Sequence, residues 1–98
     1  MELKLALKVD DLDNVATIFA NGVTDGMQVE MRDKKGISET ITVCGDVPYG
    51  HKIAVKDIQA GESIIKYGES IGRASRPIKK GDYVHVHNLE AMRGRGDL

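Results

Sequence analysis

Apolar and polar residues alternate in several short segments of this chain, a pattern typical of β-strands with one buried face. The alternation runs through residues 3–8, 28–32 and 37–44. In the first segment leucines alternate with Lys4, Ala6 and Lys8, which predicts an opening strand with one face exposed to solvent. Residues 15–20 are almost all apolar and could form a strand or a short helix. The sequence 33–36 predicts a hairpin turn, because Gly36 can adopt the positive φ that closes it.

A short repeat of apolar and glycine positions organises the rest of the chain. Val23-x-x-Gly26-x-x-Val29 recurs as Ile58-x-x-Gly61-x-x-Ile64 and again as Ile78-x-x-Gly81-x-x-Val84. In each copy an apolar anchor precedes a glycine turn, and a second apolar residue opens the next strand. Three such units predict a compact, β-rich body with many short strands.

Composition narrows the classes of protein that this chain can be. Its 98 residues make one domain, with room for a modest core but not for a separate, self-contained catalytic cleft. The balance of 14 Lys and Arg against 15 Asp and Glu, with few aromatic residues, argues against a nucleic-acid binder. No apolar run approaches the ~20 residues that span a membrane. Cys44, the only cysteine, fits a reducing cytoplasm and is expected to be a small buried residue.

The histidines fall into two motifs, Gly50-His51-Lys52-Ile53-Ala54 and Val84-His85-Val86-His87-Asn88. Alternation in the second motif predicts a strand with Val84 and Val86 facing the core and His85 and His87 on the opposite side. Two imidazoles at this spacing can hold a metal ion or an anion together. The alternative is an exposed strand face with two solvated histidines.

Five motifs in one order carry a family resemblance. They are Asp13-Asn14-Val15-Ala16, Gly50-His51-Lys52-Ile53-Ala54, Ile65-Lys66-Tyr67-Gly68, Ile71-Gly72 and Val84-His85-Val86-His87-Asn88. With them the chain resembles the N-terminal domain of the altronate and galactarate dehydratase family, and also the small subunit of sulfolactate sulfo-lyase. The resemblance implies a mainly β, SAF-like β-clip domain with short strands and little helix over residues 1–90. Residues 91–98 would be a flexible tail or linker.

The reaction implied by the resemblance is β-elimination of water from a sugar acid such as altronate or galactarate. A base removes the proton beside the carboxylate, and the β-hydroxyl leaves. A divalent metal, expected to be iron, would stabilise the enediolate as a Lewis acid, and neutral imidazole is a suitable ligand for it. The resemblance further implies a cytoplasmic carbon–oxygen lyase (hydro-lyase) component that shares its site, and its metal, with a large catalytic subunit and is inactive alone. The chain would be a separate small subunit or an excised domain.

Within this reading, His85 and His87 are candidate metal ligands and His51 is a candidate third ligand or general acid. Lys66 could bind the substrate carboxylate, or serve as a base if burial lowers its pKa. Arg73 and Asn88 are candidates for contacts to sugar-acid oxygens. Each has a structural alternative: His51 could bond to loop backbone, Lys66 could be solvated, and Asn88 could end a strand.

Two other functions remain open from the sequence. SAF-like domains also occur as non-catalytic carbohydrate-binding or assembly modules, which do not need paired histidines. The chain could also be the small subunit of a sulfolactate sulfo-lyase, in which sulfite replaces water as the leaving group.

Overall fold

The computed structural model describes residues 3–91, which form nine β-strands and no helix. The strands are β1 (Lys4–Lys8), β2 (Val15–Ile18), β3 (Gln28–Asp33), β4 (Ser38–Thr42), β5 (Lys52–Ala54), β6 (Ser63–Lys66), β7 (Glu69–Ala74), β8 (Tyr83–Val84) and β9 (Leu89–Ala91). The prediction of a mainly β chain with short strands is therefore confirmed. Residues 92–98 lie outside the described residues, so the predicted tail over 91–98 remains a prediction.

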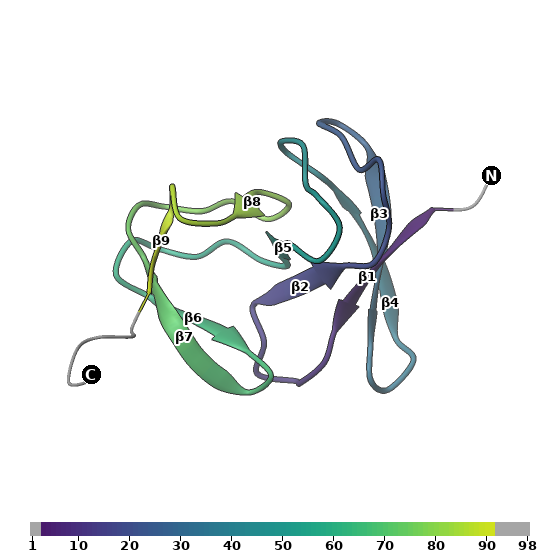
Figure 1. Ribbon diagram of the computed structural model, residues 1–98. Helices are drawn as coiled ribbons and strands as arrows, with labels where there is room; N and C mark the ends of the chain where they lie inside the picture. Colours follow the sequence, from purple (N-terminus) through teal and green to yellow (C-terminus); the bar gives the residue numbers. More distant parts are fainter. Residues whose placement is uncertain (1–2, 92–98) are drawn as a thin grey trace.

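The strands form a six-stranded sheet and a three-stranded sheet within the described residues. The larger has the order β4-β3-β1-β2-β5-β8, in which only β1 and β3 run parallel, and the smaller has the order β6-β7-β9. Figure 1 shows β1, β3 and β4 at one end of an elongated body, the three-stranded sheet at the other, and β2 and β5 between them. Strands β2 and β5 therefore link the two halves of the domain.

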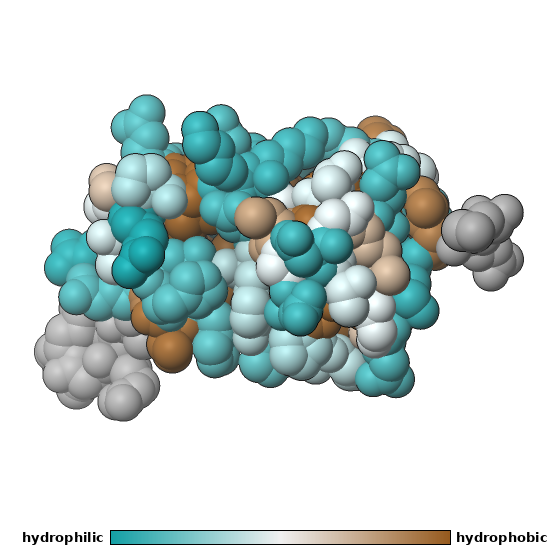
Figure 2. Space-filling model, turned by 90° about the horizontal axis from the view of Figure 1, so that it is seen from above, coloured by the Kyte–Doolittle hydropathy of each residue, from teal (hydrophilic) through white to brown (hydrophobic). Residues whose placement is uncertain are grey.

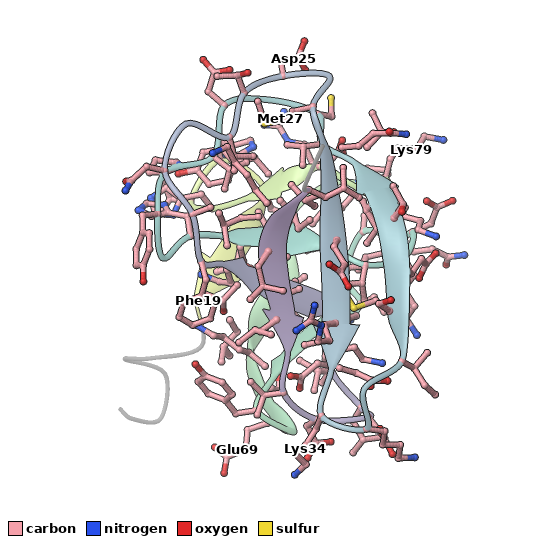
Figure 3. The ribbon with its side chains drawn as sticks, turned by 90° about the vertical axis from the view of Figure 1, so that its right-hand side faces the viewer. Phe19, Asp25, Met27, Lys34, Glu69 and Lys79 are labelled. Carbon is pink, nitrogen blue, oxygen red and sulfur yellow. The ribbon has the colours of Figure 1, made fainter. Side chains whose placement is uncertain are left out.

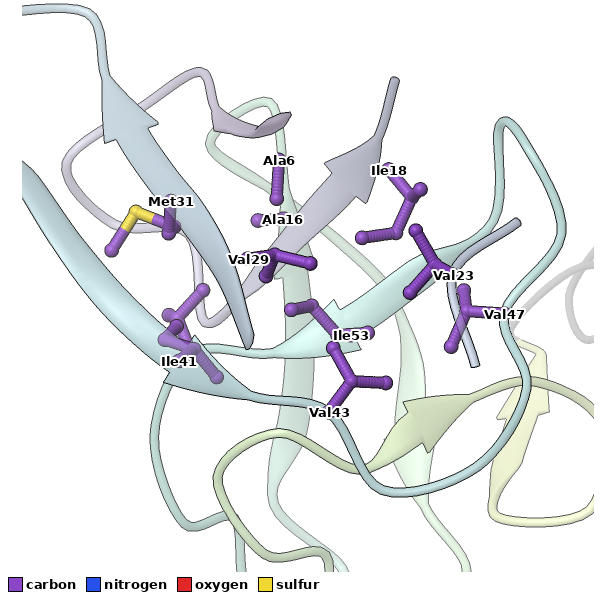
Figure 4. Packing of buried hydrophobic residues seen from close by; sticks show 11 residues of the cluster. Ala6, Ala16, Ile18, Val23, Val29, Met31, Ile41, Val43, Val47 and Ile53 are labelled. Atoms are coloured by element: carbon purple, nitrogen blue, oxygen red, sulfur yellow. The ribbon is translucent and has the colours of Figure 1, made fainter. Parts of the chain in front are cut away.

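Two hydrophobic clusters lie on opposite faces of β2 and β5. The first, shown in Figure 4, contains Ala6, Ala16, Ile18, Val23, Val29, Met31, Ile41, Val43, Val47, Ile53 and Val55. The second contains Val15, Ala54, Ile58, Ile64, Ala74, Ile78 and Val84. Because successive residues of a strand face opposite sides, the unbroken burial of Val15–Ile18 lets β2 contribute to both clusters. Residues 15–18 are thus a strand rather than a helix.

The opening strand has the predicted alternation, but its smallest apolar residue faces the core. Ala6 is fully buried, whereas the larger leucines beside it, Leu5 and Leu7, are only partly buried. Ala6 is in register with Ile18 on β2 and with Met31 on β3, both of them buried. These two bulky neighbours fill the core at this level and leave room only for a methyl group.

The predicted glycine turns are confirmed. The structure adds a fourth copy, which is not among the three repeats predicted from the sequence. Gly26, Gly61 and Gly81 have φ of +85°, +86° and +93°, and Gly50 in the sequence 47–53 has φ of +85°. Within the described chain, each of the four occupies the third position of a turn closed by a backbone hydrogen bond of 2.9–3.1 Å from the fourth residue to the first. This is the position of a type II turn that requires positive φ, which explains the glycine.

The four turns are paired through their apolar anchors. Val23 bridges to Val47, and Ile58 bridges to Ile78. Figure 3 shows Asp25 and Lys79, from the first and last turns, at one end of the molecule. The hairpin tips marked by Lys34 and Glu69 lie at the opposite end.

Two further local predictions have different outcomes. The hairpin turn at 33–36 is confirmed: Gly36 has φ of +88°, and the Asp33 carboxylate accepts hydrogen bonds from the Lys35 and Ile37 amides at 2.9 Å. The prediction that Cys44 is buried is wrong, because β4 ends at Thr42 and the thiol is exposed. In the described part of the chain, no helix is long and apolar enough to cross a membrane.

Candidate functional site: a histidine–tyrosine cluster

The segment that carries His85 and His87 is a turn, so the prediction of a strand over 84–88 is wrong. Strand β8 ends at Val84, and Val86, predicted to face the core, is 78% exposed. The cause is Asn88, which is buried and folds the chain back on itself. Its Oδ1 accepts a hydrogen bond from the His85 amide and its Nδ2 donates one to the Tyr83 carbonyl, both at 2.9 Å.

This turn nevertheless gathers all three histidines around one tyrosine. The rings of Tyr83 and His85 are nearly parallel, at 12°, with centroids 5.6 Å apart, and the His87 centroid is also 5.6 Å from that of Tyr83. The His51 centroid is 4.9 Å from that of His85, and its Nδ1 is 2.6 Å from the Tyr83 hydroxyl. We call His51, Tyr83, His85 and His87 the His–Tyr cluster.

Tyr83 was not among the candidates from the sequence, although its position on the strand indicates its role. Tyr83 is in register with Ile53 of the first core cluster and packs against that cluster, whereas Val84 belongs to the second. Because side chains alternate along a strand, burial of Val84 in the second cluster places Tyr83 on the opposite face. The Tyr83 ring then covers the edge of the first cluster and meets His51.

His51 reaches Tyr83 because of the turn that precedes it. In the turns 59–62 and 79–82, the carboxylates of Glu62 and Asp82 accept hydrogen bonds from the amides of Gln59 and Lys79 at 2.8 and 2.9 Å. The equivalent turn 48–51 begins with Pro48, which has no N–H to donate. A carboxylate at position 51 would therefore have no such partner, and the His51 ring turns to the Tyr83 hydroxyl instead.

The backbone makes His51 the counterpart of Asp82. The Ile18 amide bonds to the His51 carbonyl and the Gly50 amide to the Ile18 carbonyl, both at 2.8 Å. The Ala54 amide bonds to the Asp82 carbonyl at 3.0 Å, and the Gly81 amide to the Ala54 carbonyl at 2.8 Å. His51 and Asp82 thus occupy matching places, each at the end of a turn that leads into a central strand.

The other candidates lie apart from the His–Tyr cluster. Lys66 ends β6, and its ammonium lies 5.0 Å from the ring centroid of Tyr67. Arg73 pairs with Glu90 across β7 and β9 at 3.1 Å, and both side chains are about two-thirds exposed. Within the described residues, neither Lys66 nor Arg73 has a ring contact, hydrogen bond or ion pair with the cluster. Asn88 holds the cluster's backbone in place, as described above.

The cluster does not by itself make a complete metal site. Among the described residues, no group of three or more His, Cys, Asp or Glu side chains is placed to hold a metal ion. His51 and His85 are the closest pair of imidazoles in the cluster, and one nitrogen of His51 is already bonded to Tyr83. A divalent metal bound here would need further ligands from outside this segment.

The surface around β8 is mixed in character. Strand β8 lies on the upper side in Figure 1, and the same side seen from above is largely hydrophilic with separate hydrophobic areas (Figure 2). The fold and the cluster together define a small all-β module that presents histidine and tyrosine side chains at the edge strand of its larger sheet.

The chain belongs to the altronate/galactarate dehydratase SAF domain family, whose sequence profile it matches over residues 4–92. It is 40% identical to altronate dehydratase of Escherichia coli K12 over 82 residues, which is 84% of this chain and 15% of that protein. It is 38% identical to the galactarate dehydratase (L-threo-forming) of the same organism over 78 residues, 80% of this chain and 14% of that protein. The resemblance identified from the five motifs is therefore confirmed.

A second group of relatives is much shorter. The chain is 42% identical to (2R)-sulfolactate sulfo-lyase subunit alpha of Paracoccus pantotrophus over 53 residues, 54% of this chain and 79% of that subunit. The corresponding subunit of Chromohalobacter salexigens is 45% identical over 47 residues, 48% of this chain and 50% of that subunit. The chain thus spans about 15% of the dehydratases and half or more of these subunits.

Proposed function

We propose that this chain is the small subunit or N-terminal domain of a sugar-acid dehydratase-type lyase in the cytoplasm. It acts with a large catalytic subunit or domain and is inactive alone. Membership of a family whose relatives are lyases supports this role, as does the small share of the dehydratases that the chain spans. The observation that carries the assignment of a site is the His–Tyr cluster, in which three imidazoles and a phenol meet at one sheet edge.

In this role His51 is the general acid for the leaving β-hydroxyl. Its Nδ1 is bonded to the Tyr83 hydroxyl, which fixes the ring and leaves Nε2 to face the substrate. The neighbouring His85 ring, stacked on Tyr83, limits the motion of both. The large subunit closes over this edge and supplies the rest of the site.

His85 and His87 are proposed as ligands of a divalent metal, expected to be iron, that binds only when the partner completes the ligand set. Bound there, the metal would stabilise negative charge on the enediolate. The ring centroids of His85 and His87 both lie 5.6 Å from that of Tyr83, which places the two imidazoles around one side chain at the sheet edge. Metal content of the chain, measured alone and with its partner, tests this assignment.

The lyase role is tested by reconstituting the chain with its large subunit or domain and measuring dehydration of altronate and galactarate. His51→Gln and His85→Gln should each lower kcat by at least tenfold while leaving the circular dichroism and the affinity for the large subunit unchanged. Lys34→Gln, at the exposed tip of the hairpin between β3 and β4, is the matched control. Full activity in both histidine variants would contradict the site, and turnover by the chain alone would contradict the shared site.

A sulfolactate sulfo-lyase subunit is the second candidate. It is favoured by the 79% of the Paracoccus pantotrophus subunit that the chain spans. Release of sulfite from sulfolactate by the same reconstituted complex, without dehydration of either sugar acid, would select it. Sugar-acid binding without turnover of any of the three compounds would instead indicate a non-catalytic carbohydrate-binding module.

A further inference from the structure

Strand β1 turns its leucines away from the first core cluster. Ala6 is the residue of this strand that lies in that cluster, so alternation places Leu3, Leu5 and Leu7 on the opposite face of the sheet. Leu3 is exposed, and Leu5 and Leu7 are only partly buried. Large apolar side chains usually lie in a core, so a row of leucines that the described residues leave partly open indicates a surface for a partner.

Two aromatic side chains extend this row of leucines. The Phe19 amide donates a 2.9 Å hydrogen bond to the Leu5 carbonyl, which continues the pairing of Ala6 with Ile18 by one residue. Because Ile18 belongs to the first core cluster, Phe19 faces the other side, next to Leu5. Figure 3 shows Phe19 beside β1, on the side away from β3 and β4. Its ring meets that of Tyr49 edge-on, with centroids 6.0 Å apart, and both rings are exposed. We call the following residues the β1 face: Leu3, Leu5, Leu7, Phe19 and Tyr49.

The β1 face adjoins the His–Tyr cluster through one turn. Tyr49 and His51 both lie in the turn 48–51, which is closed by a 3.1 Å backbone hydrogen bond. Residues two positions apart are separated by at most about 7 Å. The same turn makes two backbone hydrogen bonds of 2.8 Å with Ile18, the residue before Phe19. A protein that covers His51 therefore comes within reach of the Phe19 and Tyr49 rings.

The charged residues in register with the leucines neutralise each other. Glu30 and Arg32 of β3 are in register with Leu5 and Leu7, and they form an ion pair with each other at 3.1 Å. Nucleic acids and anionic membranes bind through clusters of basic residues that are free to pair with them. An apolar face beside a neutral ion pair is suited instead to an apolar surface of another protein.

We propose that the β1 face is the surface on which the large catalytic subunit or domain docks, with an apolar segment of that partner packed against the leucines and the two rings. This inference rests on the proposed function, in which that partner closes over His51. In the altronate dehydratase relative the matching segment is 15% of the protein, so there the module has a much larger neighbour in its own chain. Phe19 and Tyr49 are the anchors of the interface, because aromatic rings bury large apolar areas.

Docking is tested by measuring the affinity of the 98-residue chain for its separately purified large subunit or domain by isothermal titration calorimetry. Phe19→Ser and Tyr49→Ser should each raise Kd by about tenfold or more. Ile37→Ser is the matched control, because Ile37 is also exposed and apolar but lies at the hairpin between β3 and β4, outside the β1 face. It should leave Kd unchanged. Unchanged Kd in both aromatic variants, or an equal increase in Ile37→Ser, would overturn the docking surface.

Footprinting with hydroxyl radicals tests the same surface without any substitution. The Phe19 and Tyr49 rings of the native chain should be oxidised more slowly in the complex than in the free chain. Tyr67 is the matched control, because it is 55% exposed, as is Tyr49, and lies in the hairpin between β6 and β7. Its oxidation rate should not change. Equal rates for Phe19 and Tyr49 in the free and bound chain would overturn the proposal even if the serine variants fail to fold.

Further outcomes separate the docking surface from the other possibilities. A dimer of the free chain in sedimentation equilibrium, dissociated by Phe19→Ser, would make a second copy the occupant and overturn the assignment to the large subunit. A complex that forms through the β1 face but converts neither sugar acid nor sulfolactate would contradict the lyase role and support the docking. An active complex whose affinity does not depend on Phe19 or Tyr49 would contradict the docking alone. Absence of any complex would contradict both.

Discussion

The Tyr83 hydroxyl and Nδ1 of His51 lie 2.6 Å apart and join the edge strand β8 to the turn that precedes β5. The two residues are 32 positions apart in the sequence. Their hydrogen bond joins the turn 48–51, which His51 ends, to the strand that follows the turn 79–82. It engages Nδ1 of His51 and leaves Nε2 outside this bond.

Tyr83→Phe removes this hydrogen bond and keeps the ring. We expect a loss of about 0.5–1.5 kcal/mol in the free energy of unfolding, typical of one partly buried hydrogen bond, measured by urea denaturation. The stacking of the ring on His85 should persist, so the fold is retained. In the NMR spectrum the signals of the His51 ring should change more than those of His87.

Tyr49→Phe is the control for this change. Tyr49 is exposed, lies in the same turn as His51, and makes an edge contact with Phe19. Tyr49→Phe should change the free energy of unfolding by less than about 0.5 kcal/mol. An effect of Tyr49→Phe on the His51 ring as large as that of Tyr83→Phe would contradict the specific link between His51 and Tyr83.

Asn88→Ala tests the turn that carries His85 and His87. The substitution leaves the His85 amide and the Tyr83 carbonyl without their partners in a partly buried place. Each unsatisfied group costs about 1–3 kcal/mol, so we expect a loss of about 2–4 kcal/mol. Hydrogen exchange at the His85 amide should accelerate more than at strands β1 and β3, and the exposed Asn21→Ala should have no such effect.

Much of the fold could be predicted because local signals agreed with the tertiary structure. The glycine turns, the 33–36 hairpin and the short strands all follow from residues whose conformational preferences are strong. Which side chains of a strand face the core was less predictable. Ala6 rather than the leucines faces the core because Ile18 and Met31 come from strands remote in the sequence, and alternation alone does not report their volume.

The site was predicted in part. The sequence singled out all three histidines of the cluster, but attributed the proximity of His85 and His87 to a strand. The alternating pattern at 84–88 is overridden by Asn88, whose side chain competes with backbone pairing and closes a turn. The contact between His51 and His85 could not be predicted, because it depends on the antiparallel register of β5 and β8.

Two glycine-to-alanine substitutions should separate the energetic cost of an unfavourable backbone conformation from the cost of steric overlap. Gly26 and Gly81 occupy equivalent turns with φ of +85° and +93°. An added Cβ at Gly26 meets open space, whereas at Gly81 it overlaps the Thr42 carbonyl oxygen. Gly26→Ala should therefore cost about 1–2 kcal/mol from conformation alone, and Gly81→Ala should cost at least twice as much in urea denaturation. Equal costs would show that the contact with Thr42 is readily relieved.

Cys44 should react slowly with alkylating reagents although its side chain is exposed. A hydrogen bond to the Asp82 carboxylate, the charge of that group, burial and the charge of Asp25 raise its pKa. Because the thiolate is the reactive form, its fraction at pH 8 is lower than for a free cysteine, and it grows only as the pH rises toward the raised pKa.

Asp82→Asn removes the negative charge while its amide oxygen can still accept the Lys79 amide hydrogen bond of the turn. The pKa of Cys44 should fall, and alkylation by iodoacetamide at pH 8 should become faster. The gain should shrink at pH values above the raised pKa, where the native thiol is also ionised. Asp11→Asn, whose carboxylate pairs with Lys35, is the matched control and should not change the rate. A slower or unchanged rate in Asp82→Asn would show that the Asp82 carboxylate does not control the thiol.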